Sequence, residues 1–181
     1  MSNLKRASLT LMVVVGLISA SSFAAQAQDL RVGVFDPQRV SEETDLGQQL
    51  QAELGAFQAT KQKEIDDKRL QVEQMQDQLR TQELSLSSAT RTKMEKDIQR
   101  RVLFLEAAQE TATREMQLEL AAAKMLFEEK LLIAVQEFGK SEQFSLILDR
   151  SLVAWADKTV DVTGALIDVF NRMFPADSGG S

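Results

Sequence analysis

The longest uniform feature of the chain is the stretch Ala56–Phe138, which contains no Gly, no Pro and no Cys. It is rich in Glu, Gln, Lys, Leu, Ala and Met, and such a run without a helix breaker predicts continuous helix. Its only serines, Ser85, Ser87 and Ser88, lie close together, and serine favours turns and caps over helix interiors. We therefore predict two long helices that meet at a tip near residues 85–90 and fold back as an antiparallel hairpin.

Apolar residues recur at intervals of three and four along both halves of this stretch, which is the pattern of a coiled-coil seam. On the first half the seam positions are Ile65, Val72, Met75, Leu79 and Leu86. On the second half they are Met94, Ile98, Val102, Leu105, Ala112, Met116, Ala123, Phe127, Ala134 and Phe138. Each half has roughly 45–50 residues, so the arm is predicted to project roughly 70 Å at about 1.5 Å per residue.

Polar residues interrupt this seam. Those on it or next to it are Lys61, Lys68, Gln82 and Gln109. The step from Phe57 through Lys61 to Ile65 is four plus four, and such a stutter locally unwinds a supercoil. We predict an arm whose helices are loosely packed along the seam and which is able to bend. A rigid coiled-coil spacer is the alternative that the spacing leaves open.

Residues 1–27 have the pattern of a secretory signal peptide. Lys5 and Arg6 form a basic start, an apolar core too short to span a bilayer follows, and Ala25-Gln26-Ala27 supplies a small-x-small cleavage site. Cleavage before Gln28 removes two basic residues and no acid, so the formal net charge moves from −6 to −8. We expect an exported, soluble chain in the periplasm, and its acidity argues against binding nucleic acid.

The two ends of the chain predict one small α/β body, formed by residues 28–41 and 139–175, that carries the arm at residues 42–138. Period-two alternation predicts strands over residues 30–35 and 144–148. A third strand is predicted over Leu152–Ala156 and carries the only tryptophan, Trp155.

Local signals set the expected ends of the helices. A helix is expected to begin near Ser41, and Gly139 is a plausible C-cap of the second arm helix. Thr163 can cap a last helix, which Pro175 ends. Residues 176–181 are predicted to be a flexible tail.

A body of about 50 residues is smaller than the roughly 70–80 residues that a single core usually needs without disulfides, metals or partners. The chain has no Cys and no His, so disulfides are impossible and ordinary zinc sites are not expected. Strand edges must also be paired or covered. We therefore expect self-association, with strands of several subunits closing into one barrel. The predicted interface residues are Val32, Val34, Phe144, Leu146, Leu148 and Trp155.

Several segments, in this order and spacing, together resemble the Skp/OmpH family of periplasmic chaperones. They are Arg31-Val32-Gly33-Val34-Phe35-Asp36, Arg91-Thr92-Lys93-Met94-Glu95-Lys96-Asp97-Ile98, Phe144-Ser145-Leu146-Ile147-Leu148-Asp149, Val153-Ala154-Trp155 and Asp161-Val162-Thr163. The resemblance covers essentially the whole mature chain. It implies a mainly α fold with a small β body (α+β), in which a homotrimeric β-barrel association domain carries three helical arms around a cavity. It also implies an ATP-independent holdase for unfolded outer-membrane proteins.

The charge of this chain differs from that of the best-known members of the family, which are strongly basic. The tip is nevertheless basic, since six Lys and Arg outnumber three Asp and Glu from Arg80 to Arg101. The candidate contact residues there are Arg91, Lys93, Lys96, Arg100 and Arg101. Such a cluster could bind acidic clients or the anionic headgroups of lipid or lipopolysaccharide, with a solvated helix surface as the alternative.

The second half of the stretch has more large apolar residues than one seam requires. They include Met94, Leu103, Phe104, Met116, Leu118, Leu120, Met125 and Leu126. An unfolded outer-membrane barrel exposes alternating apolar residues that aggregate in water, and many weak contacts with the arms would hold it reversibly. These residues are candidates for client contact, with packing inside the hairpin as the alternative.

Two other classes of function compete with the chaperone. A periplasmic coiled-coil scaffold or adaptor with one defined partner could use the same hairpin, because fold does not fix function. An enzyme is not expected, since the chain has no His, Cys or Tyr, no Gly-rich phosphate loop and no G-x-S-x-G sequence. We therefore predict no catalytic residue, no cofactor and no metal site.

Overall fold

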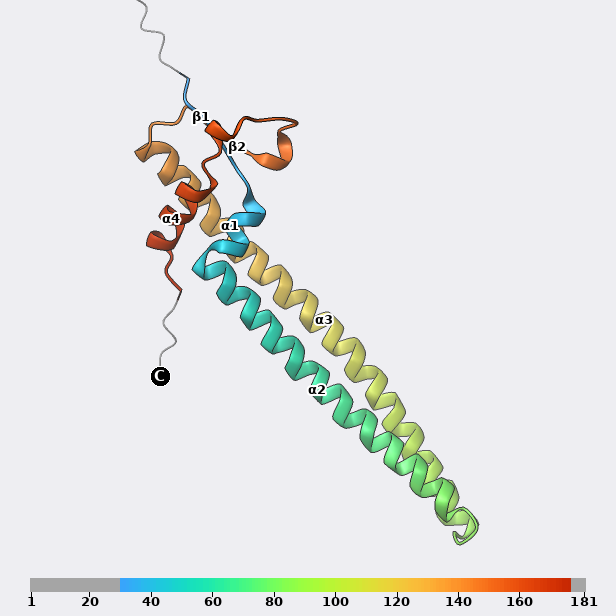
Figure 1. Cartoon of the computed structure of the whole chain (residues 1–181). Helices are drawn as coiled ribbons and strands as arrows, with labels where there is room; N and C mark the ends of the chain where they lie inside the picture. Colours follow the sequence, from blue (N-terminus) through green and yellow to red (C-terminus); the bar gives the residue numbers. More distant parts are fainter. Residues whose placement is uncertain (1–29, 177–181) are drawn as a thin grey trace, which may run out of the picture.

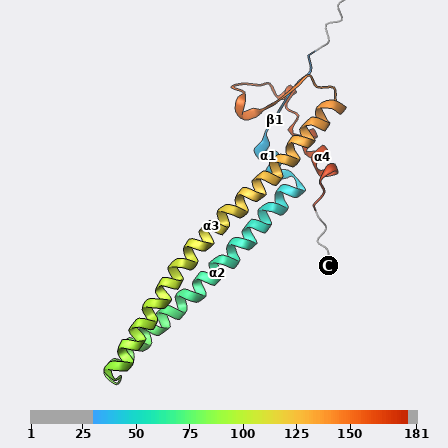
Figure 2. The ribbon, with the colours of Figure 1, turned by 180° about the vertical axis from the view of Figure 1, so that it is seen from behind.

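The computed structural model describes residues 30–176 as a long two-helix arm attached to a small body (Figure 1). Helices α2 (Asp45–Gln82) and α3 (Ser88–Ser141) run antiparallel and are joined by residues 83–87 at the far end. The view from behind shows the same two helices side by side (Figure 2). The helical hairpin is therefore as predicted. The expected signal peptide, 1–27, lies outside the described residues, as does all but Ala176 of the expected tail.

The serines mark the tip because one of them caps a helix. Ser87 is the N-cap of α3, and its hydroxyl oxygen accepts a hydrogen bond from the backbone N–H of Thr90 at 3.2 Å. The two helices pack along the predicted seam, where Val72 of α2 and Ile98 of α3 are both buried. Every other seam position is at least partly buried. The seam was predictable because its spacing follows the helical period.

The body contains β1 (Val32–Phe35), α1 (Pro37–Glu43), β2 (Leu146–Asp149), two short 3₁₀ turns and α4 (Thr163–Met173). β1 and β2 form a two-stranded parallel sheet in which Val32 lies opposite Leu146. Parallel strands need a long crossover connection, and here α1 and the whole arm supply it.

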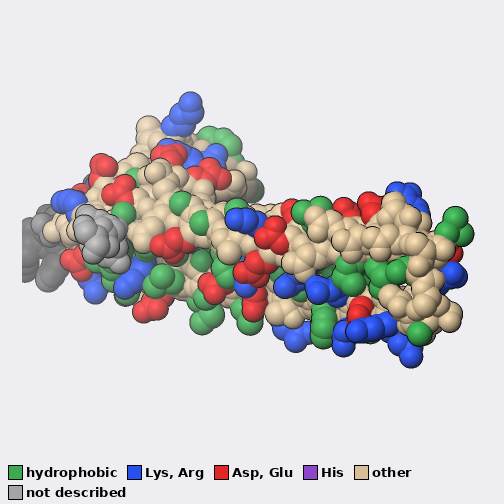
Figure 3. All heavy atoms as spheres, turned by 90° about the horizontal axis from the view of Figure 1, so that it is seen from below, with side chains coloured by type: hydrophobic (Ala, Val, Ile, Leu, Met, Phe, Trp, Pro, Cys, Tyr) green, Lys and Arg blue, Asp and Glu red, His purple; other side chains and the backbone are tan. Residues whose placement is uncertain are grey.

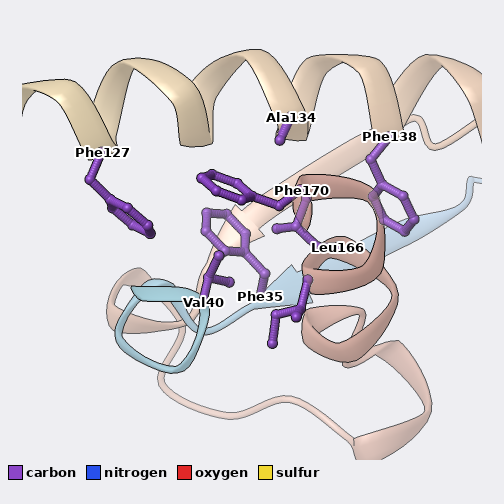
Figure 4. Packing of buried hydrophobic residues seen from close by; sticks show 8 residues of the cluster. Phe35, Val40, Phe127, Ala134, Phe138, Leu166 and Phe170 are labelled. Carbon is purple, nitrogen blue, oxygen red and sulfur yellow. The ribbon is translucent and has the colours of Figure 1, made fainter. Parts of the chain in front are cut away.

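The core of the body lies where the base of α3 crosses α4 (Figure 4). Phe127 of α3 packs against Phe170 of α4 with ring centroids 5.4 Å apart. Leu166 and Phe170 of α4 and Val40 of α1 are fully buried. The core therefore includes α3 from Phe127 to Phe138, a segment that the sequence assigned to the arm alone.

The start of α1 differs from the prediction. The helix begins at Pro37 and not near Ser41, because Asp36 is its N-cap. The Asp36 carboxylate accepts hydrogen bonds from the backbone N–H groups of Gln38 and Arg39, at 3.0 and 3.2 Å. Proline at the first helical position fits such a start, since its missing N–H has no partner to lose.

The end of α3 also differs. The helix passes through Gly139 and ends in a Schellman motif, in which Gln143 takes the left-handed conformation with φ of 57°. The Phe144 N–H donates to the Gly139 carbonyl at 2.9 Å, and the Gln143 N–H donates to the Lys140 carbonyl at 3.3 Å. The predicted C-cap at Gly139 is therefore wrong.

The predicted third strand over Leu152–Ala156 is also wrong for the single chain. Arg150–Leu152 forms a 3₁₀ turn, and the segment that follows extends away from the core as a loop (Figure 1). A strand needs a neighbour for its backbone hydrogen bonds, and within residues 30–176 nothing pairs with this segment. Trp155 on the loop is 80% exposed.

An elbow centred on Thr44 connects α1 to α2. Thr44 is fully buried, ends α1 and caps α2, and its hydroxyl accepts a hydrogen bond from the Gly47 N–H at 3.3 Å. The side-chain oxygen of Asn171 on α4 accepts from the Asp45 N–H at 3.0 Å. A Cβ at Gly47 would lie 1.9 Å from the Ser41 carbonyl oxygen. Glycine at this position lets α2 leave the body in a fixed direction.

Gly47→Ala is expected to lower the free energy of unfolding by more than about 1 kcal/mol, because the backbone of the elbow must move. Gly55→Ala is the matched control, since it lies in the same helix with nothing within 4 Å of its Cβ. Alanine at position 55 is expected to stabilise by about 0.5–1 kcal/mol. Urea titration followed by circular dichroism compares the two, and shifts of the same sign would contradict the elbow assignment.

Asp161 links the start of α4 to β1 and is predicted to make stability depend on pH. Its carboxylate accepts hydrogen bonds from the hydroxyl and the N–H of Thr163, at 2.6 and 2.9 Å, and the hydroxyl accepts from the Asp36 N–H at 3.1 Å. Thr163 is thus the first residue of α4 and not its cap. These bonds, the side-chain one first, hold the pKa of Asp161 below its usual value.

A carboxylate with a depressed folded pKa stabilises the fold above its unfolded pKa, about 3.9, and this stabilisation is lost as the pH falls through the folded pKa. We expect wild type to be more stable than Asp161→Asn at neutral pH, and the difference to shrink below about pH 4. Urea titrations at one protein concentration across this range measure it. A difference that does not change with pH would show that the Asp161 charge has no such role.

Candidate functional site

Helix α3 is apolar on two opposite faces. One face is the seam with α2. The other carries large apolar side chains that are exposed, and Leu118, Met125 and Leu132 on it are spaced seven residues apart, which places them in one row. We call this exposed face the outer stripe. Its members are Leu103, Phe104, Leu118, Met125, Leu132 and Ile133.

Helix α2 has no comparable face. Leu70 is the one large apolar side chain of α2 that is exposed in the described structure, and polar residues surround it. The two helices of the hairpin therefore differ, although both contribute to the same seam. Large exposed apolar side chains gathered on one helix face are typical of a binding site, so an apolar partner is expected on the α3 side of the arm.

The surplus of apolar residues on α3 was largely visible in the sequence. Leu103, Phe104, Leu118, Leu120, Met125 and Leu126 are all exposed, as expected for residues that the seam does not use. Met94 and Met116 are partly buried at the seam. Sequence reasoning missed Leu132 and Ile133, although the seven-residue step from Met125 to Leu132 was the signal for them.

Lys and Arg side chains gather near the tip (Figure 3), but the predicted residues among them are not equally available. Arg91 is partly buried and lies 3.7 Å from Glu83, and Arg100 pairs with Asp97. Arg101 donates to the Gln71 side chain across the arm at 2.9 Å. The other two, Lys93 and Lys96, are exposed and form no ion pair with any residue of the described range.

The body presents a second apolar surface. Of the predicted interface residues, Leu146 and Trp155 are exposed, while Val32 and Leu148 are partly buried. Phe144 packs its ring 5.4 Å from that of Phe138.

Val34 is only 3% exposed, because its side chain is covered within its own chain. Its place in an interface stays a prediction. Leu30 and Leu152 of the body are exposed as well.

Within residues 30–176, no helix is both long enough and apolar enough to cross a membrane. No cluster of three or more His, Cys, Asp or Glu in the same range could hold a metal ion.

Comparisons with known proteins agree with the sequence resemblance. A family model described as "Outer membrane protein (OmpH-like)" matches residues 31–170. Among solved structures, a crystal structure from Caulobacter crescentus CB15 is similar with a TM-score of 0.74, 16% identity, and coverage of 79% of this chain and 85% of that chain. Its protein is described as a candidate outer membrane chaperone (OmpH-like), and at this identity the likeness shows a shared fold.

A search of curated proteins gives no match. The family match begins at β1, includes the entire hairpin and ends within α4, so it covers most of the chain. The resemblance read from the sequence is therefore confirmed, and this chain belongs to the OmpH-like family.

Proposed function

We propose that this protein is an ATP-independent holdase that binds unfolded outer-membrane proteins between its arms and prevents their aggregation. The outer stripe carries the proposal, because α3 exposes large apolar side chains on the face that its own hairpin does not use. Unfolded outer-membrane barrels expose apolar residues that such a stripe can cover. Holding by many weak contacts is reversible and needs no catalytic group.

The proposed working form is a homotrimer assembled through the body. A two-stranded sheet is marginal by itself, and exposed Leu146 lies on β2 while exposed Trp155 lies on the loop that follows it. Strands of neighbouring subunits would cover these residues and pair the open edge. The number three comes from the family resemblance. Rotational symmetry would then direct three arms from one body and bring their outer stripes around one cavity.

The proposed location is the periplasm, reached by cleavage of a signal peptide after Ala27. The support is the basic start, short apolar core and cleavage pattern of residues 1–27. Unfolded outer-membrane proteins cross this compartment, so the location fits the proposed clients.

Apolar contact is expected to hold clients more strongly than charge does, so moderate salt should release little client. Salt screens exposed charges beyond roughly 8 Å at physiological ionic strength, whereas hydrophobic contact is not weakened by screening. Raising salt to about 0.3 M is expected to leave most aggregation suppression intact. Replacing the five basic tip residues with Gln is expected to slow capture more than it weakens the complex.

Stopped-flow fluorescence of several unrelated unfolded outer-membrane proteins measures the rate of client capture and the rate of client release. Release of client by moderate salt alone would show that the tip charges contribute most of the client binding. Binding of just one of the tested clients would favour a scaffold with a defined partner over a holdase.

A further inference from the structure

Three grooves follow one another along one side of the arm, between α2 and α3. The groove nearest the body has a volume of about 390 Å³ and an apolar floor that includes Leu54, Phe57 and Leu126. Two carboxylates, Glu53 from α2 and Glu119 from α3, lie at its rim, and no Lys or Arg is among its lining residues. This end of the arm therefore presents uncompensated negative charge beside apolar surface.

The middle groove, of about 330 Å³, is lined by one Lys and two Glu, which gives its lining a formal charge of −1. The Lys61 ammonium lies 2.9 Å from the Glu115 carboxylate across the arm and 3.7 Å from that of Glu64. The hydrogen bond to Glu115 raises the pKa of Lys61 above its usual value, so the lysine stays charged. Lys61 is the residue at the predicted stutter, and its ion pair with Glu115 links the two helices at this point.

The groove nearest the tip, also of about 330 Å³, has the opposite sign. Lys68 from α2 and Arg101 from α3 line it together with Phe104 and Leu105, and no carboxylate is among its lining residues. The formal charge of the groove linings thus rises from −2 through −1 to +2 between the body and the tip.

The three grooves lie on the same side of the arm. On α2 their lining residues Phe57, Lys61, Glu64 and Lys68 are spaced four, three and four, which is one helical face. On α3 the residues Leu126, Glu119 and Arg101 are separated by about two and about five whole turns, so they also share a face. We call the row of grooves the furrow. Phe104 belongs both to the furrow and to the outer stripe, so the two surfaces are continuous.

We propose that the furrow binds an extended segment of unfolded polypeptide in a fixed direction, with its basic residues toward the body and its acidic residues toward the tip. From Glu53 to Lys68 the furrow is about 22 Å long, and about seven residues of extended chain span that distance. Apolar residues at every second position of a barrel strand point to one side and would face the furrow floor. This inference rests on the proposed holdase function and adds to it a preferred orientation of the client.

The test uses the full chain and a synthetic peptide of about nine residues, with two Arg at the N-terminus, two Glu at the C-terminus and alternating Leu and Ser between. The protein has no Cys, so one introduced Cys carries a spin label at a single place. Ala56→Cys and Gln74→Cys place labels eighteen residues apart, which is five whole turns, so both lie on one face of α2 at opposite ends of the furrow. Neither residue lines a groove.

The label at position 56 is expected to broaden the NMR signals of the Arg end, and the label at position 74 those of the Glu end. A second peptide with Glu at the N-terminus and Arg at the C-terminus should bind in the reverse chain direction, with Arg still nearest position 56. This pair of peptides separates charge from chain direction.

Glu53→Lys with Glu119→Lys is expected to weaken binding of either peptide about three- to tenfold, as two exposed ion pairs are replaced by repulsion. Glu73→Lys with Glu106→Lys is the matched control, since both glutamates are exposed and outside the grooves, and it should leave the affinity unchanged. Adding Lys68→Glu and Arg101→Glu to the first pair should turn the bound peptide around.

Equal broadening of both peptide ends by either label, or no broadening at about 1 mM peptide, would overturn the inference. Broadening of the NMR signals of an unlabelled copy by a labelled copy, without peptide, would also overturn it, because a second arm would then occupy the furrow. Aggregation assays on the same wild-type protein separate the two proposals. Normal suppression with an unoriented peptide contradicts the furrow alone, whereas lost suppression contradicts the holdase itself.

Discussion

The double variant Leu118→Ser, Met125→Ser is expected to hold an unfolded outer-membrane protein at least about tenfold more weakly than wild type. The two side chains are 65% and 71% exposed, so their loss removes little packing within the chain itself. If a client covers them, each lost apolar contact should weaken the complex. Fluorescence anisotropy of a labelled, urea-unfolded outer-membrane protein measures the change in Kd.

Leu70→Ser with Leu84→Ser is the matched control for this experiment. Both leucines are exposed, at 52% and 102%, but lie on α2 and at the tip, outside the outer stripe. The control is expected to bind like wild type. An equal loss in both variants would show that general hydrophobicity, and not the outer stripe, decides binding.

Leu146→Asp is expected to dissociate the proposed trimer into monomers. Leu146 is half-exposed on β2 in the single chain, and in the assembly its side chain would be covered by a neighbouring subunit. An unpaired charge buried there costs several kcal/mol, which is comparable to the stability of a small interface. Static light scattering gives the mass. Leu103→Asp, an exposed apolar position on the arm, is the control and should leave the mass unchanged.

Assembly is also expected to survive removal of the arm, provided that the cut respects the core. A deletion that reaches Phe127 would remove a ring that packs against Phe170, and the body itself would lose stability. Deleting residues 59–121 and closing the gap with a short Gly/Ser turn keeps Phe127 and the base of both helices. A monomeric mass for wild type, or for this truncated chain alone, would contradict assembly through the body.

Much of the fold was predictable because the arm is decided by local periodicity. The seam from Ile65 to Phe138 follows from spacing, and the serine cluster located the tip. The predictions that were wrong concern places where one short sequence pattern is compatible with two local structures. Asp36-Pro37 can end a strand or start a helix, and the hydrogen bonds of Asp36 to Gln38 and Arg39 select the helix. The segment around Trp155 alternates like a strand, but pairing depends on a neighbour that the single chain does not supply.

The candidate site was predictable only in part, for a geometric reason. An exposed stripe on one helix can be read from spacing, and most of the outer stripe was found in this way. The furrow depends on which residues of α2 and α3 face each other. Glu53 and Glu119 line one groove, and Lys68 and Arg101 line another, because the tip sets the register of the hairpin. Because these residues of α2 and α3 lie far apart in the sequence, their common charge in each groove cannot be recognised before the hairpin is folded.

Holding of clients by the arms is tested most directly by light scattering of an unfolded outer-membrane protein diluted from urea into buffer. The wild-type protein and the chain lacking residues 59–121 are compared at equal subunit concentration. We expect that wild type suppresses the rise in scattering and that the truncated chain, although folded and assembled, does not. Equal suppression by the truncated chain, or none by wild type, would contradict the claim that the arms hold the client.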